Sequence, residues 1–377
     1  MKRLLPVLAG LAALAAPLPA AATPVTDCAN RDTPFSAASP LVDILLSDAA
    51  RAVLNRHSGG KFVNIPERFL GVKPPTFAAI LSLREASAFT AMSPEAVAAA
   101  DAELRKLPVT AADRVARCAR YDNDRSAIDL PPAAGKAPRV LVFEKINGFR
   151  DEPSVNAAHA ALIAMAQRKD WAIAFTDKGG AFTPKTLRKV DVVIWNNISG
   201  DVLTLSQRRA FQRWLGKGGG FVGMHGSAGD PVYFWDWYPD TLIGARFAGH
   251  PRNPQFQEAR IAVNKAHPLA AALPAEWRMT DEWYSFRTNP RSVGANVVLT
   301  LDESTYTPDG MGQNLRMGAD HPLAWTNCIG PKGREKGRMF YSAIGHRPEA
   351  YSEPNTVALL EAAIPWAASA KEACPAR

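Results

Sequence analysis

Residues 218–227 read Gly-Gly-Gly-Phe-Val-Gly-Met-His-Gly-Ser: a glycine-rich turn, a short apolar run, and a histidine between small residues. Apolar positions at helical spacing occupy residues 205–215, and residues 220–224 have the length and composition of a buried strand. Gly218 to Gly223 satisfy G-x-G-x-x-G, but a dinucleotide fingerprint must follow a strand and open a helix, the reverse of this order. We expect a helix C-cap and a tight turn here, and no nucleotide cofactor.

The same alternation of helix and strand runs through the residues before this stretch. Short apolar runs predict strands at 139–143, 171–175 and 190–195, and helical patterns lie at 155–168 and 184–189. Further strands are predicted at 296–301 and 338–344, and a last helix at 356–368. The predicted fold class is α/β, with a mostly parallel sheet covered by helices on both faces. Ligands of such sheets bind at the carboxyl ends of the strands, so residues at that edge have priority.

Residues 23–130 have a different pattern, with apolar residues every three or four positions and no cluster of carboxylates. This spacing predicts a small helical N-terminal module whose default role is packing or contact with a partner. Residues 131–138, Pro-Pro-Ala-Ala-Gly-Lys-Ala-Pro, have the composition of a linker. The α/β domain is predicted to span 139–370.

The N-terminus has the parts of a secretory signal peptide. A basic start, Met1-Lys2-Arg3, precedes an apolar, alanine-rich stretch, and small residues at 20–22 fit a cleavage site. We expect residues 1–22 to be removed and the mature chain to be exported to a periplasmic location. Since no later run of about 18 apolar residues occurs, an integral membrane protein is not expected.

The composition excludes two classes of protein. With 47% hydrophobic residues in 377, the chain can fill a core, which excludes a disordered protein. The net charge of +8 is spread along the chain without a basic run interleaved with aromatic residues, so nucleic acid is not expected as a partner. The oligomeric state stays open.

Export makes disulfides possible for the 4 cysteines. Three pairings exist, and Cys28–Cys118 with Cys328–Cys374 keeps each bridge inside one module. Free buried thiols are the alternative. No cysteine lies near other ligands at zinc-binding spacing.

Histidines gather in the second half of the chain. His225 lies at the carboxyl end of a predicted strand between small residues, as in a nucleophile elbow, where imidazole suits a general base or a metal ligand. His250, His267 and His321 each precede proline, which places them in loops or at strand ends, and His346 follows the last predicted strand. We expect at least two of these imidazoles to meet in one pocket and to hold a divalent metal such as Zn or Mn. Hydrogen-bonded structural histidines are the alternative.

Carboxylates for such a pocket come from Asp281-Glu282-Trp283-Tyr284. Adjacent side chains on an extended segment point to opposite sides, so only one of the two acids should face the pocket. A solvated acidic pair is the alternative. Arg150 and Asp151 follow the first strand and therefore share the same sheet edge.

Trp235 and Trp237 offer flat apolar faces beside polar groups. Such faces suit stacking against the ring of a small saccharide. A buried core cluster fits the same pattern equally well.

Together these segments resemble the ThuA-like family, named for trehalose utilisation. The resemblance spans roughly Arg139 to Ala370 and rests on the order of short motifs, each weak alone. They are Gly148-Phe149-Arg150, the stretch 218–225, Gly249-His250-Pro251, His267-Pro268, the stretches 281–284 and 301–306, His321-Pro322-Leu323-Ala324-Trp325, and Gly345-His346. The resemblance implies a class I glutamine amidotransferase-like, flavodoxin-like sheet.

The chain departs from that pattern at two positions. Amidotransferase relatives place cysteine at the elbow, where this chain has His225, so glutamine hydrolysis through a thiolate is not expected. Family members commonly carry histidine after Gly-Phe-Arg, where this chain has Asp151, so a ligand or base at that position would be altered.

The resemblance implies saccharide metabolism, and some members look associated with sugars oxidised to 3-keto glycosides. Elimination or hydrolysis of such a glycoside needs a base, stabilisation of an enolate oxygen and an acid for the leaving group. We assign His225 as base or ligand, His250 and His346 as ligands, and Glu282 as ligand or acid. Asp281 and Tyr284 complete the catalytic set, and the predicted substrate-binding residues are Arg150, Asp151, Trp235, Trp237 and His321.

Two other functions fit the same residues. A non-catalytic sugar-binding or accessory protein would keep the aromatic faces without turnover. A two-carboxylate glycosidase would need acids at a set separation, which Asp281 or Glu282 with Asp302 or Glu303 could supply.

Overall fold

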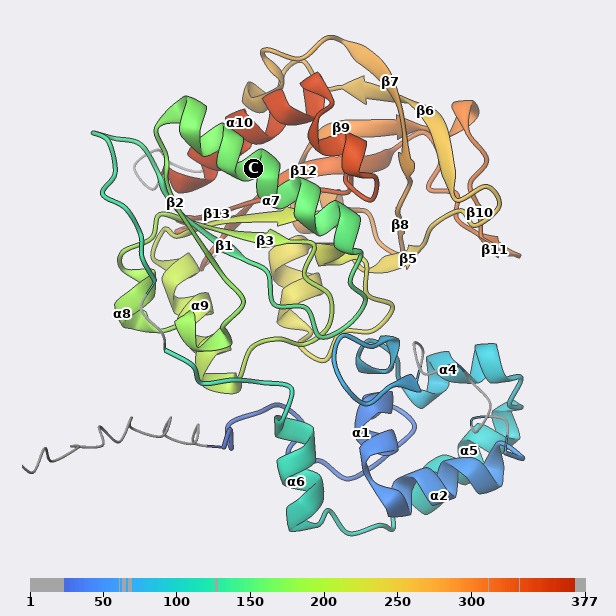
Figure 1. Cartoon of the computed structure of the whole chain (residues 1–377). Coiled ribbons are helices and arrows are strands. Elements are labelled where there is room, and N and C mark those ends of the chain that lie inside the picture. Colours follow the sequence, from blue (N-terminus) through green and yellow to red (C-terminus); the bar gives the residue numbers. More distant parts are fainter. Residues whose placement is uncertain are drawn as a thin grey trace, which may run out of the picture.

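Parallel strands of the predicted kind form one half of a nine-stranded sheet. The structure is a computed structural model, which describes residues 24–369 except 61, 63–65, 67–69, 126, 127, 311 and 332. The strand order is β2-β1-β3-β4-β13-β12-β9-β6-β7 (Figure 1). The parallel half consists of β1 (Arg139–Phe143), β2 (Ala172–Thr176), β3 (Val192–Asn196), β4 (Gly220–Met224) and β13 (Gly337–Ser342). The antiparallel half consists of β6 (Phe256–Val263), β7 (Glu276–Glu282), β9 (Asn296–Asp302) and β12 (His321–Ile329).

Helices cover both faces of the parallel half (Figure 1). On one face lie α7 (Glu152–Lys169) and α10 (Pro354–Ala368), and on the other α8 (Pro184–Leu187) and α9 (Leu205–Gly216). Gly218, two residues after the end of α9, adopts φ +106°, so the glycine-rich stretch is the predicted helix end and tight turn. A Cβ at Gly220 would meet the backbone of Ala367, so glycine lets α10 approach β4 closely. The predicted α/β fold class is confirmed.

The antiparallel half was only partly predicted. Of its four strands, β9 was expected, whereas β6, β7 and β12 were not. In β6 buried positions alternate irregularly with exposed ones, because one face is solvated and carries residues such as Glu258 and Arg260. Such a strand lacks the apolar run that marks a strand buried on both faces.

Short elements connect the strands. The small strands are β5 (Phe247–Gly249), β8 (Ser285–Phe286), β10 (Asp309–Gly310) and β11 (Gln313–Asn314). The single-turn helices are η2 (Phe77–Ala79), η3 (Gly179–Ala181), η4 (His225–Ala228), η5 (Tyr238–Ile243), η6 (Pro268–Ala270), η7 (Pro290–Val293), η8 (Glu303–Thr305) and η9 (Pro348–Tyr351).

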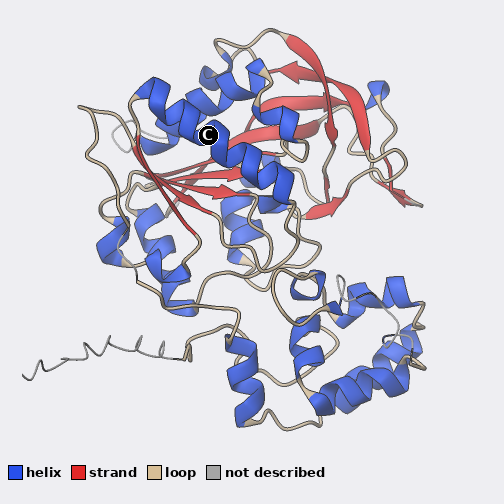
Figure 2. Cartoon of the chain, viewed as in Figure 1, coloured by secondary structure: helices blue, strands red, loops and turns tan. Residues whose placement is uncertain are grey.

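The N-terminal module contains helices and a core of its own (Figure 2). Its α-helices are α1 (Leu41–Leu46), α2 (Asp48–His57), α4 (Leu83–Thr90), α5 (Pro94–Leu104) and α6 (Ala111–Cys118). The predicted disulfide Cys28–Cys118 is present, and Cys328 is also disulfide-bonded. Its expected partner, Cys374, and the expected signal peptide at 1–22 lie outside the described residues.

The module contacts the α/β domain through specific polar groups. The carboxylate of Asp122 accepts the backbone N–H groups of Gly179 and Gly180, both at 3.0 Å. The hydroxyl of Tyr121 donates to Asp201 at 2.7 Å. These contacts bring the module to the edge of the sheet where the strands end. Within the described part of the chain, no helix is both long and apolar enough to cross a membrane.

Candidate functional site

His225 follows the last residue of β4 in a strained turn. Its φ of +32° is in the left-handed region that non-glycine residues rarely adopt, and η4 begins at this residue. Its backbone carbonyl accepts the hydroxyl of Tyr341 at 2.8 Å, which ties the turn to β13. This strand, sharp turn and short helix form the elbow that the small residues around His225 predicted.

Glu282 is the last residue of β7 and is 1% exposed. Its neighbour Asp281 points away from it and accepts three backbone N–H groups, from Glu282, Gly345 and Arg347, at 2.7–3.0 Å. The prediction that only one of the two acids faces the pocket is therefore fulfilled by Glu282. The other acid fastens the loop that follows β13 to the end of β7.

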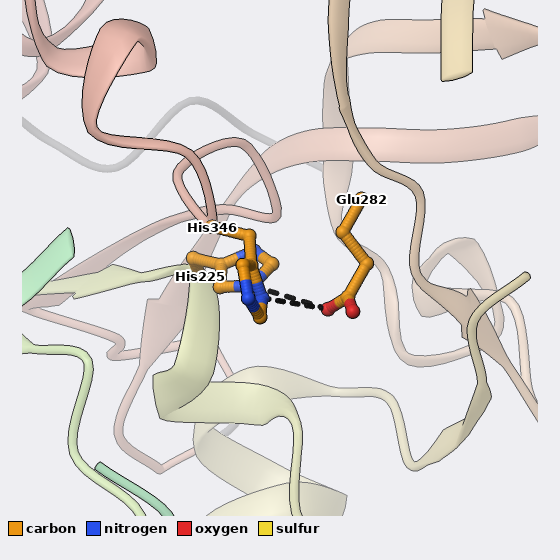
Figure 3. A group of neighbouring side chains, drawn as sticks. All are labelled: His225, Glu282 and His346. Carbon is orange, nitrogen blue, oxygen red and sulfur yellow. Dashed lines mark hydrogen bonds and ion pairs between the residues drawn. The ribbon is translucent and has the colours of Figure 1, made fainter. Parts of the chain in front are cut away.

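His346 lies in that loop and meets the other two side chains. Its Nδ1 is 3.2 Å from Nε2 of His225 and 3.0 Å from Oε2 of Glu282 (Figure 3). His225 Nε2 is 3.5 Å from the same Oε2. We call His225, Glu282 and His346 the triad. It joins the ends of β4 and β7 with the loop after β13.

The triad has the donor types and spacing of a metal site. All three ligand atoms lie within 4.8 Å of one another. A tetrahedral ion with bonds of about 2.0–2.1 Å holds its ligand atoms about 3.4 Å apart, close to the separations found here. Two imidazoles and a carboxylate suit Zn or Mn. The residues present therefore fit a divalent ion.

The hydrogen bond on the other side of His225 supports this arrangement. Nδ1 lies 2.7 Å from the carbonyl oxygen of Ala343, and only a protonated nitrogen can donate to it. In the neutral ring, Nε2 is then an acceptor that faces the acceptor Oε2 of Glu282. A cation between the two atoms, or a second proton on His225, satisfies both. Fixing one nitrogen by a backbone carbonyl is the usual way a ligating histidine is oriented.

Electrostatics also favour positive charge beside Glu282. Burial alone would raise the pKa of Glu282, but the neighbouring imidazoles of His225 and His346 lower it well below its usual range. Burial would lower the pKa of His346, but the hydrogen bond and charge of Glu282 raise it. The Glu282 carboxyl is therefore ionised, which suits a ligand better than an acid.

His250 and Tyr284 border the triad. Nδ1 of His250 is 3.1 Å from Oε1 of Glu282 and 2.8 Å from the carbonyl oxygen of Pro251. Burial lowers the pKa of His250, which outweighs the charge of Glu282 and keeps the ring neutral at pH 7. The Tyr284 ring packs on His225 with centroids 4.1 Å apart. His250 thus faces the opposite carboxylate oxygen from the triad histidines.

Asp151 and Arg150 lie at the same sheet edge, as predicted. Oδ2 of Asp151 is 3.7 Å from Nε2 of His346, beyond hydrogen-bond distance, and its charge contributes to the raised pKa of that ring. The Arg150 guanidinium instead pairs with Glu152 beside it.

Other predicted site residues are engaged elsewhere. His321 bonds Glu303 at 2.9 Å and the carbonyl oxygen of Tyr284 at 2.8 Å, and it is fully buried. Asp302 forms an ion pair with Arg260. With Glu303 and Asp302 held in this way, the pair of acids that a glycosidase would need is not gathered at the triad.

Trp235 and Trp237 stack on each other with centroids 5.2 Å apart. Both also contact Phe211 of α9 and pack against the main core. His267 caps η6 and bonds Thr326 at 3.1 Å. The structure therefore does not bring these three residues to the triad.

Sequence reasoning missed three residues at the site. Gln255 donates to Oε1 of Glu282, and the rings of Phe149 and Phe256 lie beside His346. The sequence marked Phe149 only as part of the motif Gly148-Phe149-Arg150 and gave it no role at the site. Phe256 begins the unpredicted strand β6, so no signal placed it near Glu282.

Comparison with known proteins shows the family of the chain. A family model described as "ThuA: Trehalose utilisation" matches residues 139–367. A ThuA-like protein of Bacteroides uniformis is 26% identical, with a TM-score of 0.52, over 63% of this chain and 94% of that protein. A ThuA-like protein of Parabacteroides merdae is 17% identical, with a TM-score of 0.46, over 64% of this chain and 93% of that protein. Among curated proteins, no sequence matches.

Proposed function

Because the chain belongs to the ThuA, trehalose utilisation family, we propose that it cleaves 3-keto glycosides at the triad with the help of a divalent ion. The observation that carries the proposal is the convergence of His225 Nε2, His346 Nδ1 and Glu282 Oε2 at the carboxyl edge of the sheet. Nitrogen and carboxylate donors in this spacing are suited to a metal that stabilises an oxyanion.

The chemistry follows from the ketone at C3 of the sugar. That ketone acidifies the hydrogen at C2, so a base can remove it and leave an enolate at the C3 oxygen. The electron pair then forms the C1–C2 double bond while the bond from C1 to the glycosidic oxygen breaks. One proton is removed and one is given to the leaving oxygen, and later addition of water to the double bond would complete a hydrolysis.

The residues divide these tasks. A bound divalent ion would supply positive charge to the developing enolate oxygen. His225, Glu282 and His346 are the residues that would hold it, and the carbonyl oxygen of Ala343 orients the His225 imidazole.

His250 is the base in this proposal. With Nδ1 donating to the carbonyl oxygen of Pro251, its Nε2 carries the lone pair, and its lowered pKa keeps that atom free at pH 7. The imidazolium formed is then able to return the proton to the leaving oxygen. Such general base catalysis supplies about 10²–10⁴-fold, so oxyanion stabilisation must supply much of the rest.

We also propose that the chain acts after export to the periplasm. Its basic, apolar and small-residue N-terminus favours this. The Cys28–Cys118 disulfide agrees with an oxidising compartment.

The test combines metal analysis with turnover. We expect about one divalent ion per chain, lost to a chelator together with turnover of 3-keto-trehalose. His225→Ala and Glu282→Gln should lose both, whereas His267→Gln, outside the triad, should keep both. Saccharide binding without turnover would instead favour an accessory protein. Cleavage of unoxidised trehalose that is lost in Glu303→Gln would favour a glycosidase.

A further inference from the structure

Two exposed phenylalanine rings lie against the same triad imidazole. Phe149 is 41% exposed and Phe256 is 40% exposed, both unusual for large apolar side chains in this protein. The Phe149 ring stacks beside His346 with centroids 6.4 Å apart, and the Phe256 ring lies 5.2 Å from the same imidazole. Apolar surface left open beside a buried polar cluster is typical of a ligand site.

The sheet register places Phe256 at the triad. Phe256, the first residue of β6, pairs directly with Glu282, the last residue of β7. Side chains of directly opposed residues lie on the same face of an antiparallel pair. The ring therefore stands beside the Glu282 carboxylate, and the preceding residue, Gln255, donates to that carboxylate.

The loop after β1 holds Phe149 from the other end of the sheet. The Phe149 N–H donates to Oγ of Ser199 at 3.0 Å, and the Gly148 N–H donates to the carbonyl oxygen of Ser199 at 2.9 Å. A Cβ at Gly148 would collide with Ser199 and Ile80, so the loop can be this tight only with glycine. Phe149 is consequently exposed on a fixed backbone rather than on a free loop.

We propose that Phe149 and Phe256 form the platform on which the pyranose rings of the substrate stack. A pyranose has an apolar C–H face and a hydroxyl edge, which match phenyl rings that lie beside the half-buried imidazole of His346. An acyclic polyol has the same hydroxyls but no ring face. The inference rests on the proposed function for its substrate class, cyclic glycosides, and it replaces Trp235 and Trp237 as the stacking residues.

The helical module takes part through Phe77. The ring of Phe77, at the start of η2, packs on Phe149 with centroids 5.1 Å apart. The neighbouring Thr76 N–H donates to the carbonyl oxygen of Asn147 at 3.0 Å. Phe77 is thus a positioning residue that holds the Phe149 ring over the site.

The experiment measures binding separately from cleavage. Trehalose has pyranose faces but no ketone, so it cannot form the enolate, and titration calorimetry with trehalose reports binding alone. We expect Phe149→Leu and Phe256→Leu, which keep apolar volume but lose the flat ring, each to weaken trehalose binding about tenfold. Val115→Ala, which alters a 64% exposed apolar residue on α6, should leave binding unchanged. D-mannitol should not bind.

Phe77→Ala should weaken binding by itself but add little in the Phe149→Leu background, because its effect passes through that ring. Trehalose binding unchanged in both leucine variants, mannitol binding equal to trehalose binding, or no trehalose binding at all would overturn the platform. Turnover of 3-keto-trehalose with KM unchanged in the leucine variants would overturn the platform and leave the proposed function standing. Trehalose binding that depends on the two rings, without any turnover of 3-keto-trehalose, would support the platform and overturn the proposed function.

Discussion

A 2.7 Å hydrogen bond from the Gly345 N–H to Oδ2 of Asp281 joins the loop after β13 to the end of β7. Each residue neighbours a triad member in the chain: Asp281 precedes Glu282 and Gly345 precedes His346. The strand that carries Glu282 is the last in the sheet order, whereas the strand before His346 is in the middle. The bond therefore fixes the distance between two triad residues that the sheet alone would not set.

Asp281→Asn should weaken metal binding although Asp281 is not a ligand. An amide keeps one acceptor oxygen but turns N–H groups toward a backbone donor, which leaves a buried donor without an acceptor at a cost of about 1–3 kcal/mol. Changes to residues that orient ligands typically lower metal affinity about 10–100-fold. Competition with a chromophoric chelator measures the affinity, and urea unfolding measures the stability. Metal affinity within twofold of the parent would contradict this role.

Trp235→Ala should destabilise the fold and leave sugar binding alone. Trp235 stacks on Trp237, and the Arg208 guanidinium lies 5.1 Å above its ring, so its removal opens a gap in a half-buried cluster. Removing a fully buried tryptophan lowers the free energy of unfolding by about 3–5 kcal/mol. Because Trp235 is half-buried, we expect a decrease of about 2–3 kcal/mol. Urea unfolding and trehalose calorimetry on the same preparation separate the two effects. Weaker trehalose binding at unchanged stability would instead assign the ring to the substrate.

The sequence was sufficient to predict the parallel half of the sheet and the elbow. Strands such as β3 are buried at every position and form plain apolar runs, and the small residues around His225 predict a sharp turn. Strands β6 and β7 of the antiparallel half were missed because each has solvated positions and mixes charged with apolar residues.

From local spacing alone, the composition of the triad could be predicted only as a class, and the assignment of His225, His346 and Glu282 was made with the family resemblance in view. Local spacing indicated that histidines and one acid of the Asp281-Glu282 pair would meet, but contacts between distant strands decide which ones. His321 has the same His-Pro context as His250, yet it pairs with Glu303 rather than with Glu282. Nothing local to either histidine distinguishes these partners.

The Asp230 carboxyl should make stability fall as pH rises. Burial raises the pKa of Asp230 to about 7, and the charge of Asp201 adds to the rise. Hydrogen bonds from the Ser199 hydroxyl and the Gly200 N–H act in the opposite direction but are outweighed. The unfolded side chain titrates near pH 4, so between about pH 4 and 7 the native state binds the extra proton. The contribution of Asp230 to the free energy of unfolding is therefore fully present below about pH 4. Between about pH 4 and 7 it falls by up to about 1.4 kcal/mol per pH unit.

Asp230→Asn should remove that slope and leave a pH-independent loss, since the amide cannot accept the Gly200 N–H and the Ser199 hydroxyl equally well. Urea unfolding of both proteins at intervals between pH 4.5 and 8 gives the difference in free energy of unfolding. Parallel curves for the two proteins would show that Asp230 has an ordinary pKa in the fold.

His225→Gly should be more stable than His225→Ala. Both variants lack the imidazole and its hydrogen bond to Ala343, so they differ only in the backbone at φ +32°. A residue with a Cβ in the left-handed region costs about 1–2 kcal/mol, whereas glycine adds about 0.5–1 kcal/mol of unfolded-chain entropy. The glycine variant should therefore be more stable by up to about 1 kcal/mol in urea unfolding with chelator present. The same pair at Arg213, an exposed position in α9, should show the opposite order, because glycine weakens a helix by about 1 kcal/mol relative to alanine. If alanine were the more stable residue at both positions, the elbow would carry no backbone strain, and the histidine would be held at the sheet edge by its side-chain contacts alone.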